Sequence, residues 1–285
     1  MKFTKMHSLG NDYIYIDLFT EKINDPFRWA KFLSHRRYGV GSDGLVLIGA
    51  SDIADFSMRI FNVDGSEAQM CGNALRSVGK YVYIKKYTLN KEFTIETLAG
   101  IKKIYITDCS DQFKVKANIG SPIFDYQVIP CTQELIDHPY SIKNETFYLN
   151  SISMGNPHCV IFTNNLESLK IEEYGPILED NEFYPEKTNV EFVEVIDRNT
   201  LKMRVWERGC GETWACGTGC SAAAAISILH NYTNRKMKIF QLGGVLDIEW
   251  SEIDGSIYME SDAQIVYSGE VDINALEQFE RIIEK

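Results

Sequence analysis

The sequence contains no long apolar run. None of its 285 residues lies in a stretch approaching the roughly 18 apolar residues that a membrane-spanning helix needs. The first seven residues, Met1 to His7, lack the apolar stretch of a secretion signal, so we expect a cytoplasmic protein. Low-complexity segments and long linkers are also absent. With 45% hydrophobic and 24% charged residues, the composition is that of a soluble globular chain.

Patterns typical of metal sites and disulfide frameworks are equally scarce. The chain has 5 histidines and 7 cysteines, and no two cysteines form a CxxC pair. An odd number of cysteines without a secretion signal argues against a disulfide framework. Cys210, Cys216 and Cys220 are not spaced as structural zinc ligands are. We therefore expect no metal, and we expect at least some of the thiols to be reduced.

Basic residues are fewer than acidic residues in this sequence. Lysine and arginine number 29 against 40 acidic residues, which gives a formal net charge of −11. This balance argues against non-specific binding to nucleic acid or to anionic membranes. A small zwitterionic substrate fits it better.

Short strand-like runs are the commonest elements, and several alternate apolar and polar residues as half-buried antiparallel strands do. The predicted strands are 13–17, 45–48, 56–61, 93–97, 114–117, 158–162, 189–193, 202–206 and 245–250. The predicted helices are fewer: 26–37, 71–86, 166–174 and 216–231. The last contains Ala222–Ala225 within a run that is apolar on every face, so we expect this helix to be buried.

An internal repeat is the most informative feature of the chain. The pairs Cys71-Gly72 and Cys216-Gly217 are separated by 216 − 71 = 145 residues. The segments 8–11 (Ser-Leu-Gly-Asn) and 153–156 (Ser-Met-Gly-Asn) show the same offset, since 156 − 11 = 145. Two separate blocks with one offset predict two homologous halves, which meet near Gly120-Ser121-Pro122.

Each half places a cysteine directly before a glycine at the start of a predicted helix. The first N–H groups of a helix have no partner within the helix and carry partial positive charge. A thiol at this position is more easily ionised, and the same N–H groups, those of Gly72-Asn73 and Gly217-Thr218, can bind a carboxylate. If the halves pack with pseudo-twofold symmetry, two thiols flank the α-carbon of one bound carboxylate.

This arrangement suits inversion of configuration at a carbon next to a carboxylate. One thiolate removes the α-proton from one face, and the opposite thiol supplies a proton to the other face. The helix N-termini stabilise the negative charge that develops on the carboxylate. The reaction needs no pyridoxal phosphate, and no lysine stands in a recognisable cofactor motif, so we expect no cofactor.

At these residues the chain resembles the diaminopimelate epimerase family, cofactor-independent isomerases of lysine and peptidoglycan-precursor synthesis. The segments that carry the resemblance are 6–12, 61–66, 71–73, 153–158, 188–190, 206–213 and 215–219, and the segment 258–269 also fits. They follow the order of the family and span nearly the whole chain. The resemblance implies epimerisation of LL-diaminopimelate to meso-diaminopimelate by a thiolate/thiol pair, in a homodimer.

The resemblance also implies a fold of the α/β class (α+β type). Two pseudo-symmetric domains would each wrap a mostly antiparallel sheet around a central helix, with the active site in the cleft between them. We expect residues 1–119 to form the half with Cys71 and residues 120–261 the half with Cys216. Residues 262–285 would return to the first half.

Site residues follow from the same motifs. Catalysis would rest on Cys71 and Cys216, with His158 and Glu207 supporting proton transfer. The end of the substrate that is inverted would be held by Asn11, Gly72, Asn73, Gly217 and Thr218. The distant amino-acid end would contact Asn62, Asn156, Asn189, Glu207 and Arg208, because a guanidinium pairs with a carboxylate and a carboxylate with an ammonium.

Some positions depart from the family pattern, and some cysteines have no assigned role. Gly44 stands where some members carry a glutamine that touches the substrate amine, and Ala74 stands where glycine is common. Cys210 is an uncommon choice in its loop. The cysteines outside the catalytic pair are expected to be buried and inert, namely Cys109, Cys131, Cys159, Cys210 and Cys220.

Three other functions remain open at this point. A related two-cysteine racemase could act on histidine or hydroxyproline. A redox or metal-binding protein could use Cys210, Cys216 and Cys220. An amino-acid-binding protein would leave the α-hydrogen of its ligand unexchanged.

Overall fold

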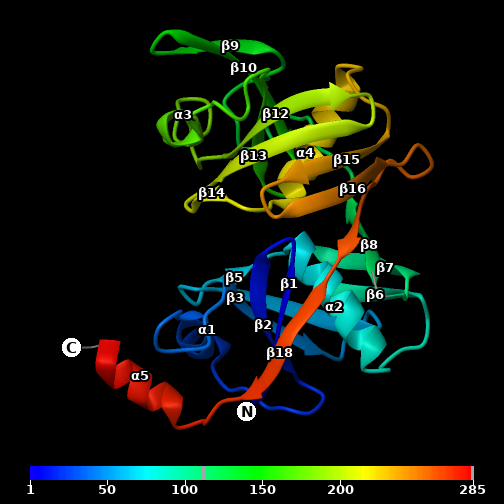
Figure 1. Cartoon of the computed structure of the whole chain (residues 1–285), viewed down its shortest axis with the longest axis vertical. Helices are drawn as coiled ribbons and strands as arrows, with labels where there is room; N and C mark the ends of the chain where they lie inside the picture. The colour runs from blue at the N-terminus through cyan, green and yellow to red at the C-terminus, as the bar shows by residue number, and fades with distance from the viewer. Residues whose placement is uncertain (111–112, 284–285) are drawn as a thin grey trace. The chain divides into compact units, whose positions relative to one another are not determined.

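The chain folds as two compact units, each combining strands with helices. The computed structural model describes residues 1–110 and 113–283 (Figure 1). The first unit comprises Met1–Ala117 and Ser261–Lys285, and the second comprises Asn118–Glu260. Strands predominate in both, so the predicted mixed α/β class is confirmed.

The first unit begins with a three-stranded antiparallel arrangement, since β1 pairs with both β2 and β18. Strand β2 then pairs in parallel with β3, and β3 pairs antiparallel with β4. The strands are β1 (Lys2–Ser8), β2 (Asn11–Asp17), β3 (Gly44–Gly49), β4 (Phe56–Asn62), β5 (Glu67–Ala68), β6 (Glu92–Thr97), β7 (Gly100–Asp108), β8 (Lys114–Gly120, which runs into the second unit) and β18 (Gln264–Glu270). The helices are α1 (Pro26–Ser34), α2 (Gly72–Ile84) and α5 (Ala275–Ile283).

The second unit has the same kind of sheet. Strand β10 pairs antiparallel with β9 and β11, β11 pairs in parallel with β12, and β12 pairs antiparallel with β13. Its strands are β9 (His138–Ile142), β10 (Glu145–Ser153), β11 (Pro157–Phe162), β12 (Asn189–Asp197), β13 (Thr200–Glu207), β14 (Gly211–Thr213), β15 (Lys236–Gln241), β16 (Gly244–Trp250) and β17 (Ile257–Asp262, which runs into the first unit). Its helices are α3 (Ile171–Glu179) and α4 (Gly217–Leu229).

The offset of 145 residues is reproduced element by element. Adding 145 to the bounds of α2 gives the bounds of α4, and adding it to those of α1 gives those of α3. The pairings match as well: β2 with β3 corresponds to β11 with β12, and both pairs are parallel. Likewise β4 is parallel to β6, and β13 is parallel to β15. The two units are therefore copies of one topology.

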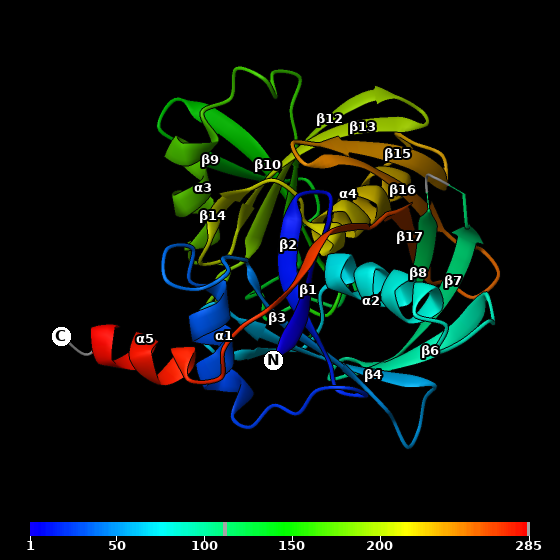
Figure 2. The ribbon, with the colours of Figure 1, turned by 60° about the horizontal axis from the view of Figure 1, so that its bottom comes forward.

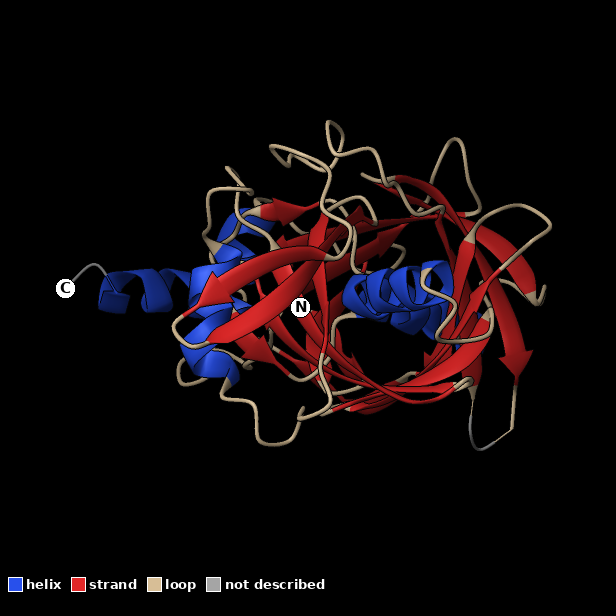
Figure 3. Ribbon diagram, turned by 90° about the horizontal axis from the view of Figure 1, so that it is seen from above, coloured by secondary structure: helices blue, strands red, loops and turns tan. Residues whose placement is uncertain are grey.

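Each unit contains a largely buried helix. Figure 3 shows the strands in red and the helices in blue. Helix α4 packs against β10, β11, β12 and β16, and Ala222–Ala225 are fully buried, as the alanine-rich run predicts. Helix α2 packs against β1 and β7, and a Cβ on Gly79 would lie 2.9 Å from Ile104 Cγ2. Both helices have 13 residues. In the described part of the chain no helix is long and apolar enough to cross a membrane.

The C-terminal helix α5 lies beside α1 in the first unit (Figure 2). The rings of Phe32 and Phe279 are 5.4 Å apart between centroids, and Phe279 is buried. Arg28 pairs with Glu280 through two hydrogen bonds across the rim of this contact. Apolar packing therefore holds the end of the chain on the first unit, since an exposed ion pair adds little.

One predicted helix is wrong in its position. The sequence predicts a helix over 166–174, but α3 runs over Ile171–Glu179. The pair Gly175-Pro176 would ordinarily end a helix, yet both residues lie inside α3. A Cβ on Gly175 would lie 2.5 Å from the Trp206 ring, so the missing side chain lets the helix pack directly on the indole. Tertiary packing thus overrides the local signal.

We predict that Ala224→Leu destabilises the second unit by about 1–3 kcal/mol, because α4 leaves no room for a larger side chain. Chemical denaturation at equilibrium measures the change in free energy of unfolding. Leu229→Ala, at a half-exposed position at the end of the same helix, should change it by no more than about 0.5 kcal/mol. An Ala224→Leu variant as stable as the wild type would show that α4 is loosely packed.

Candidate active site

Cys71 is the residue that precedes α2 in the first unit. Its backbone is extended, with φ −137° and ψ 121°, and the helix begins at Gly72 as the sequence predicts. The thiol is partly exposed, and its sulfur lies 3.5 Å from Asn11 Oδ1. The first-turn N–H groups therefore stand next to a thiol and close to a side-chain amide.

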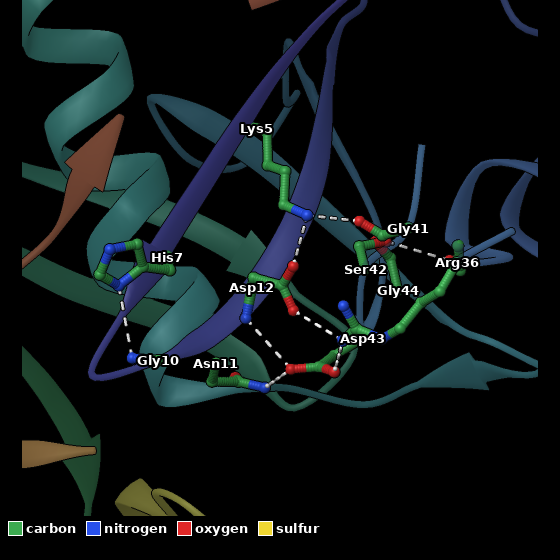
Figure 4. A network of polar contacts seen from close by, with 11 residues as sticks. Lys5, His7, Gly10, Asn11, Asp12, Arg36, Gly41, Ser42, Asp43 and Gly44 are labelled. Carbon is green, nitrogen blue, oxygen red and sulfur yellow. Dashed lines mark hydrogen bonds and ion pairs between the residues drawn. The ribbon is translucent and has the colours of Figure 1, made fainter. Parts of the chain in front are cut away.

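The amide of Asn11 is held in one orientation (Figure 4). Its Nδ2 donates to Asp43 Oδ2 at 2.9 Å, so its oxygen must point the other way. That oxygen accepts from Asn73 Nδ2 at 3.3 Å and faces Cys71. The structure thus brings together three predicted site residues, Asn11, Cys71 and Asn73.

Asp43, which the sequence analysis did not identify, belongs to a network of charges shown in Figure 4. Arg36 Nη2 contacts both Asp43 (2.8 Å) and Asp12 (3.0 Å), and Lys5 contacts Asp12 at 2.7 Å. Burial, followed by the charge of Asp12, raises the pKa of Asp43. Burial also acts to raise the pKa of Asp12, but hydrogen bonds from Lys5 and Arg36 lower it overall. The network fixes the carboxylate that orients Asn11.

Arg76 anchors Asn73 from within α2. The guanidinium is fully buried and donates to Asn73 Oδ1 at 2.6 Å. It also donates to the hydroxyls of Ser8 (3.0 Å) and Ser261 (2.9 Å). Buried arginine is rare without such partners, and these contacts account for its position inside the unit.

Tyr13 is a further neighbour of Cys71 that the sequence analysis missed. A Cβ on Gly44 would lie 2.8 Å from Tyr13 Cε1, so the glycine makes room for the buried tyrosine ring. Burial, then the charge of Cys71 and a hydrogen bond with it, raise the pKa of Tyr13 well above its usual value. Since 13 + 145 = 158, Tyr13 occupies in the first unit the chain position that His158 occupies in the second.

Cys216 precedes α4 with an almost identical backbone, φ −125° and ψ 108°. Its surroundings differ from those of Cys71. The Cys216 sulfur accepts a hydrogen bond from the N–H of Gly219 at 3.3 Å and lies 3.5 Å from Thr218 Oγ1. Its own N–H donates to Gln241 Oε1 at 2.8 Å. Cys216 is buried, whereas Cys71 is partly exposed.

Acidic groups surround Cys216. Burial, followed by the charges of Glu207 and Glu191, raises the pKa of Cys216 well above its usual value. Hydrogen bonds from Thr218 and Gly219 oppose that shift. Burial also raises the pKa of Glu207, although hydrogen bonds with Thr213 and Cys216 lower it in part. Both effects favour the protonated forms of this carboxyl and this thiol.

His158 lies in the same unit and is fully buried. Its Nδ1 is 2.7 Å from Glu191 Oε1, and its Nε2 is 3.0 Å from Asn156 Oδ1. His158 also acts on Glu207 by lowering its pKa. The predicted residues His158, Asn156, Glu207 and Cys216 therefore lie together around Glu191, a residue that the sequence analysis missed.

Asn189 and Arg208 are joined at the ends of β12 and β13. Asn189 Oδ1 accepts from the N–H of Arg208 at 3.0 Å, and Asn189 Nδ2 donates to Pro157 O at 2.8 Å. The Arg208 side chain is exposed and donates to Glu186 O at 3.2 Å. Asn62, in the first unit, is exposed at the end of β4, and its amide donates to Ser66 Oγ at 3.0 Å.

The described residues 1–110 and 113–283 contain no group of three or more His, Cys, Asp or Glu side chains that could hold a metal ion. All seven cysteines are thiols. The expectation that every cysteine outside the catalytic pair is buried is wrong for two of them, since Cys109 and Cys210 are exposed. Cys109 directly follows β7, and Cys210 lies in the turn between β13 and β14.

The chain is similar in sequence to proteins of one known family. The family model for diaminopimelate epimerase matches residues 3–124 and 150–266. A diaminopimelate epimerase of Methanococcus maripaludis is 52% identical over 277 residues, covering 96% of this chain and 100% of that protein. One of Acetivibrio thermocellus is 49% identical over 280 residues, covering 97% and 100%.

Solved structures share the fold at much lower identity. A PhzF-family phenazine biosynthesis protein of Bacillus anthracis is 17% identical, with a TM-score of 0.69 over 96% of this chain and 99% of that chain. A hydroxyproline epimerase of Agrobacterium vitis is 13% identical, with a TM-score of 0.67 over 96% and 93%. These likenesses establish the fold alone.

The thiols should differ in reactivity according to exposure. Among the cysteines outside the proposed catalytic pair, we predict that Cys109 and Cys210 are alkylated first at neutral pH, whereas Cys159 reacts only after unfolding, because burial raises the pKa of Cys159 to about 12. Timed labelling with iodoacetamide followed by peptide mapping measures the order. Labelling of Cys159 as fast as that of Cys109 would contradict the buried position of Cys159.

Proposed function

Because the chain belongs to the diaminopimelate epimerase family, we propose that it converts LL-diaminopimelate to meso-diaminopimelate, in lysine and peptidoglycan-precursor synthesis. The observation that carries the proposal is the repeated cysteine. Each unit presents a thiol directly before the first N–H groups of a buried helix. Inversion at an α-carbon needs one proton carrier for each face, and the two halves supply one each.

The helix N-termini would hold the carboxylate of the amino-acid end that is inverted. The N–H groups of Gly72, Asn73, Gly217 and Thr218 begin the two helices, and neither helix has an acidic residue in its first turn. Removing the α-proton places extra negative charge on that carboxylate, which these N–H groups stabilise. The amide of Asn11, held by Asp43, would contact the same end of the substrate.

Proton transfer would depend on the groups around Cys216. The pKa values of Cys216 and Glu207 are both raised, so each group holds its proton to a higher pH than usual. Such groups suit a site that must give up a proton as well as accept one. His158 and Glu207 would support transfer at this thiol, and the chemistry requires no cofactor.

The distant amino-acid end of the substrate would be read by Asn62, Asn156, Asn189, Glu207 and Arg208. Support comes from the second unit, where Asn189 fixes the backbone of Arg208 and leaves its guanidinium exposed. A guanidinium binds a carboxylate through two parallel hydrogen bonds, and a glutamate suits the ammonium beside it.

The proposal extends to the setting of the enzyme. We propose that it acts in the cytoplasm as a homodimer, without nucleic-acid or membrane partners. The exposed apolar residues Ile265, Val266 and Tyr267 on β18 support self-association. This strand pairs with β1, and a second copy could cover these exposed apolar side chains.

The test is incubation with LL- or meso-diaminopimelate in deuterated water. We expect wild-type protein to interconvert them while deuterium enters the α-position, and Cys71→Ala and Cys216→Ala each to lose epimerisation by several orders of magnitude while remaining folded. Mass spectrometry and chiral chromatography measure both events. Exchange with histidine or hydroxyproline and not with diaminopimelate would assign a different racemase, and no exchange with any substrate would indicate a binding protein.

Arg208→Lys should lower kcat/KM for diaminopimelate by roughly tenfold or more, because lysine lacks the bidentate fork. Arg198→Lys is the matched control, since Arg198 donates to Asn231 and Asn234 on another edge of the same unit. Steady-state kinetics of both variants measures the difference. Unchanged kinetics in Arg208→Lys would place this guanidinium outside the substrate site.

A further inference from the structure

Glu191 is a carboxyl group enclosed in the second unit. It lies on β12, within the buried segment 189–193, and is fully buried. Its backbone pairs with Val160 on one side and Val205 on the other. A Cβ on Gly219 would lie 2.7 Å from Glu191 Oε1, so the carboxyl group points at the first turn of α4. This is the turn whose N–H group contacts the Cys216 sulfur.

The burial of Glu191 is costly for the fold. Its Oε2 is among the buried side-chain atoms that have no hydrogen-bond partner in the described residues. An unsatisfied buried acceptor destabilises the folded state, and more so if it is charged. The corresponding position in the first unit, 191 − 145 = 46, is Val46, which is also fully buried. A valine therefore satisfies the packing of this position, and packing alone does not explain a glutamate.

Gly219 shows that the second unit is adapted to the carboxyl group. Its counterpart in the first unit, 219 − 145 = 74, is Ala74. The first unit thus combines Val46 with Ala74, whereas the second combines Glu191 with Gly219. Removing the methyl group at position 219 provides the space that Glu191 Oε1 occupies.

The partner of Glu191 is His158. Both ring nitrogens of His158 face oxygen acceptors, Nδ1 toward Glu191 at 2.7 Å and Nε2 toward the Asn156 amide oxygen at 3.0 Å. A neutral imidazole has one donor and one acceptor nitrogen. Where Glu191 is ionised and the Asn156 amide presents its oxygen, both contacts are hydrogen bonds only when each nitrogen carries a proton. The negative charge of Glu191 compensates the positive charge of such a ring.

We propose that Glu191 is a positioning residue that fixes the His158 ring and keeps both of its nitrogens protonated. The inference deepens the proposed function, in which His158 supports proton transfer at Cys216. The pair follows a general arrangement in which a third group orients the acid or base that serves a catalytic thiol. Other ionisable groups act in the same space, since Glu191 influences Cys159, Glu207 and Cys216 through its charge.

The first test uses nuclear magnetic resonance and needs no substrate. Protein labelled with ¹⁵N in its 5 histidines is examined at pH 7, and the His158 ring is assigned from a His158→Gln sample. We expect protons on both ring nitrogens of His158 in the wild type and on one in Glu191→Gln, which keeps the size and loses the charge. A ring with one proton in the wild type, or with two in Glu191→Gln, would overturn the proposal.

The second test is kinetic. Glu191→Gln should lower kcat for epimerisation by roughly tenfold to a hundredfold, with KM changed by less than about twofold, because the substrate is not contacted. Asp17→Asn is the matched control: Asp17 is a buried carboxylate that accepts from the hydroxyls of Tyr81 and Tyr87 in the first unit.

The control variant should lose stability in thermal unfolding and keep its kcat. Equal kcat values for Glu191→Gln and Asp17→Asn would show that Glu191 has only a structural role. Wild-type protein that fails to epimerise diaminopimelate would instead refute the proposed function, and the protonation of His158 would still be decided by resonance.

Discussion

A cysteine in extended conformation, directly before a buried helix, is the constraint on which both units depend. The helix must start at the next residue so that its first N–H groups remain without intrahelical partners. The body of the helix must also be covered by the sheet, because an exposed dipole end is screened by water and salt. The alanines of α4 follow from this requirement, since only small side chains let strands approach a helix on several faces.

The two units keep this backbone and change the polar groups around it. The Cys71 thiol can donate to Asn11 Oδ1, whereas the Cys216 sulfur accepts from the N–H of Gly219. Strands β2 and β11 are equivalent in the two units, and at the same position β2 carries Tyr13 and β11 carries His158. Duplication therefore preserved the helix terminus and the position of the sulfur, and the surrounding side chains diverged.

Much of the fold followed from the sequence, the strands from their alternating pattern and the helices after Cys71 and Cys216 from the repeat. The strands over 45–48 and 158–162 lie within β3 and β11, and the helices after Cys71 and Cys216 begin where predicted. The helix over 166–174 failed because it was inferred from local pattern alone. The offset of 145, applied to the first predicted helix at 26–37, gives 171–182 and so locates α3 correctly at its start.

Glu191 could not be recognised by the same reasoning. In the alternating segment 189–193, a glutamate between valine and phenylalanine indicates a side chain that faces solvent. Strand β12 is instead buried on both faces, with α4 on one side and α3 on the other. Burial of the face that carries Glu191 depends on α4, which lies outside the strand in sequence, so the pattern within the strand carries no sign of it.

The N-termini of α2 and α4 have side chains of opposite charge near them. The first unit buries the Arg76 guanidinium within α2, linked to Asn73 and through it to Asn11. The second unit buries Glu191 and half-buries Glu207 near Cys216, and their charges add to burial in favouring its protonated thiol. A two-base inversion requires one sulfur with a proton and one without. In the proposed two-base inversion, the surroundings of Cys216 favour the state in which this sulfur carries the proton.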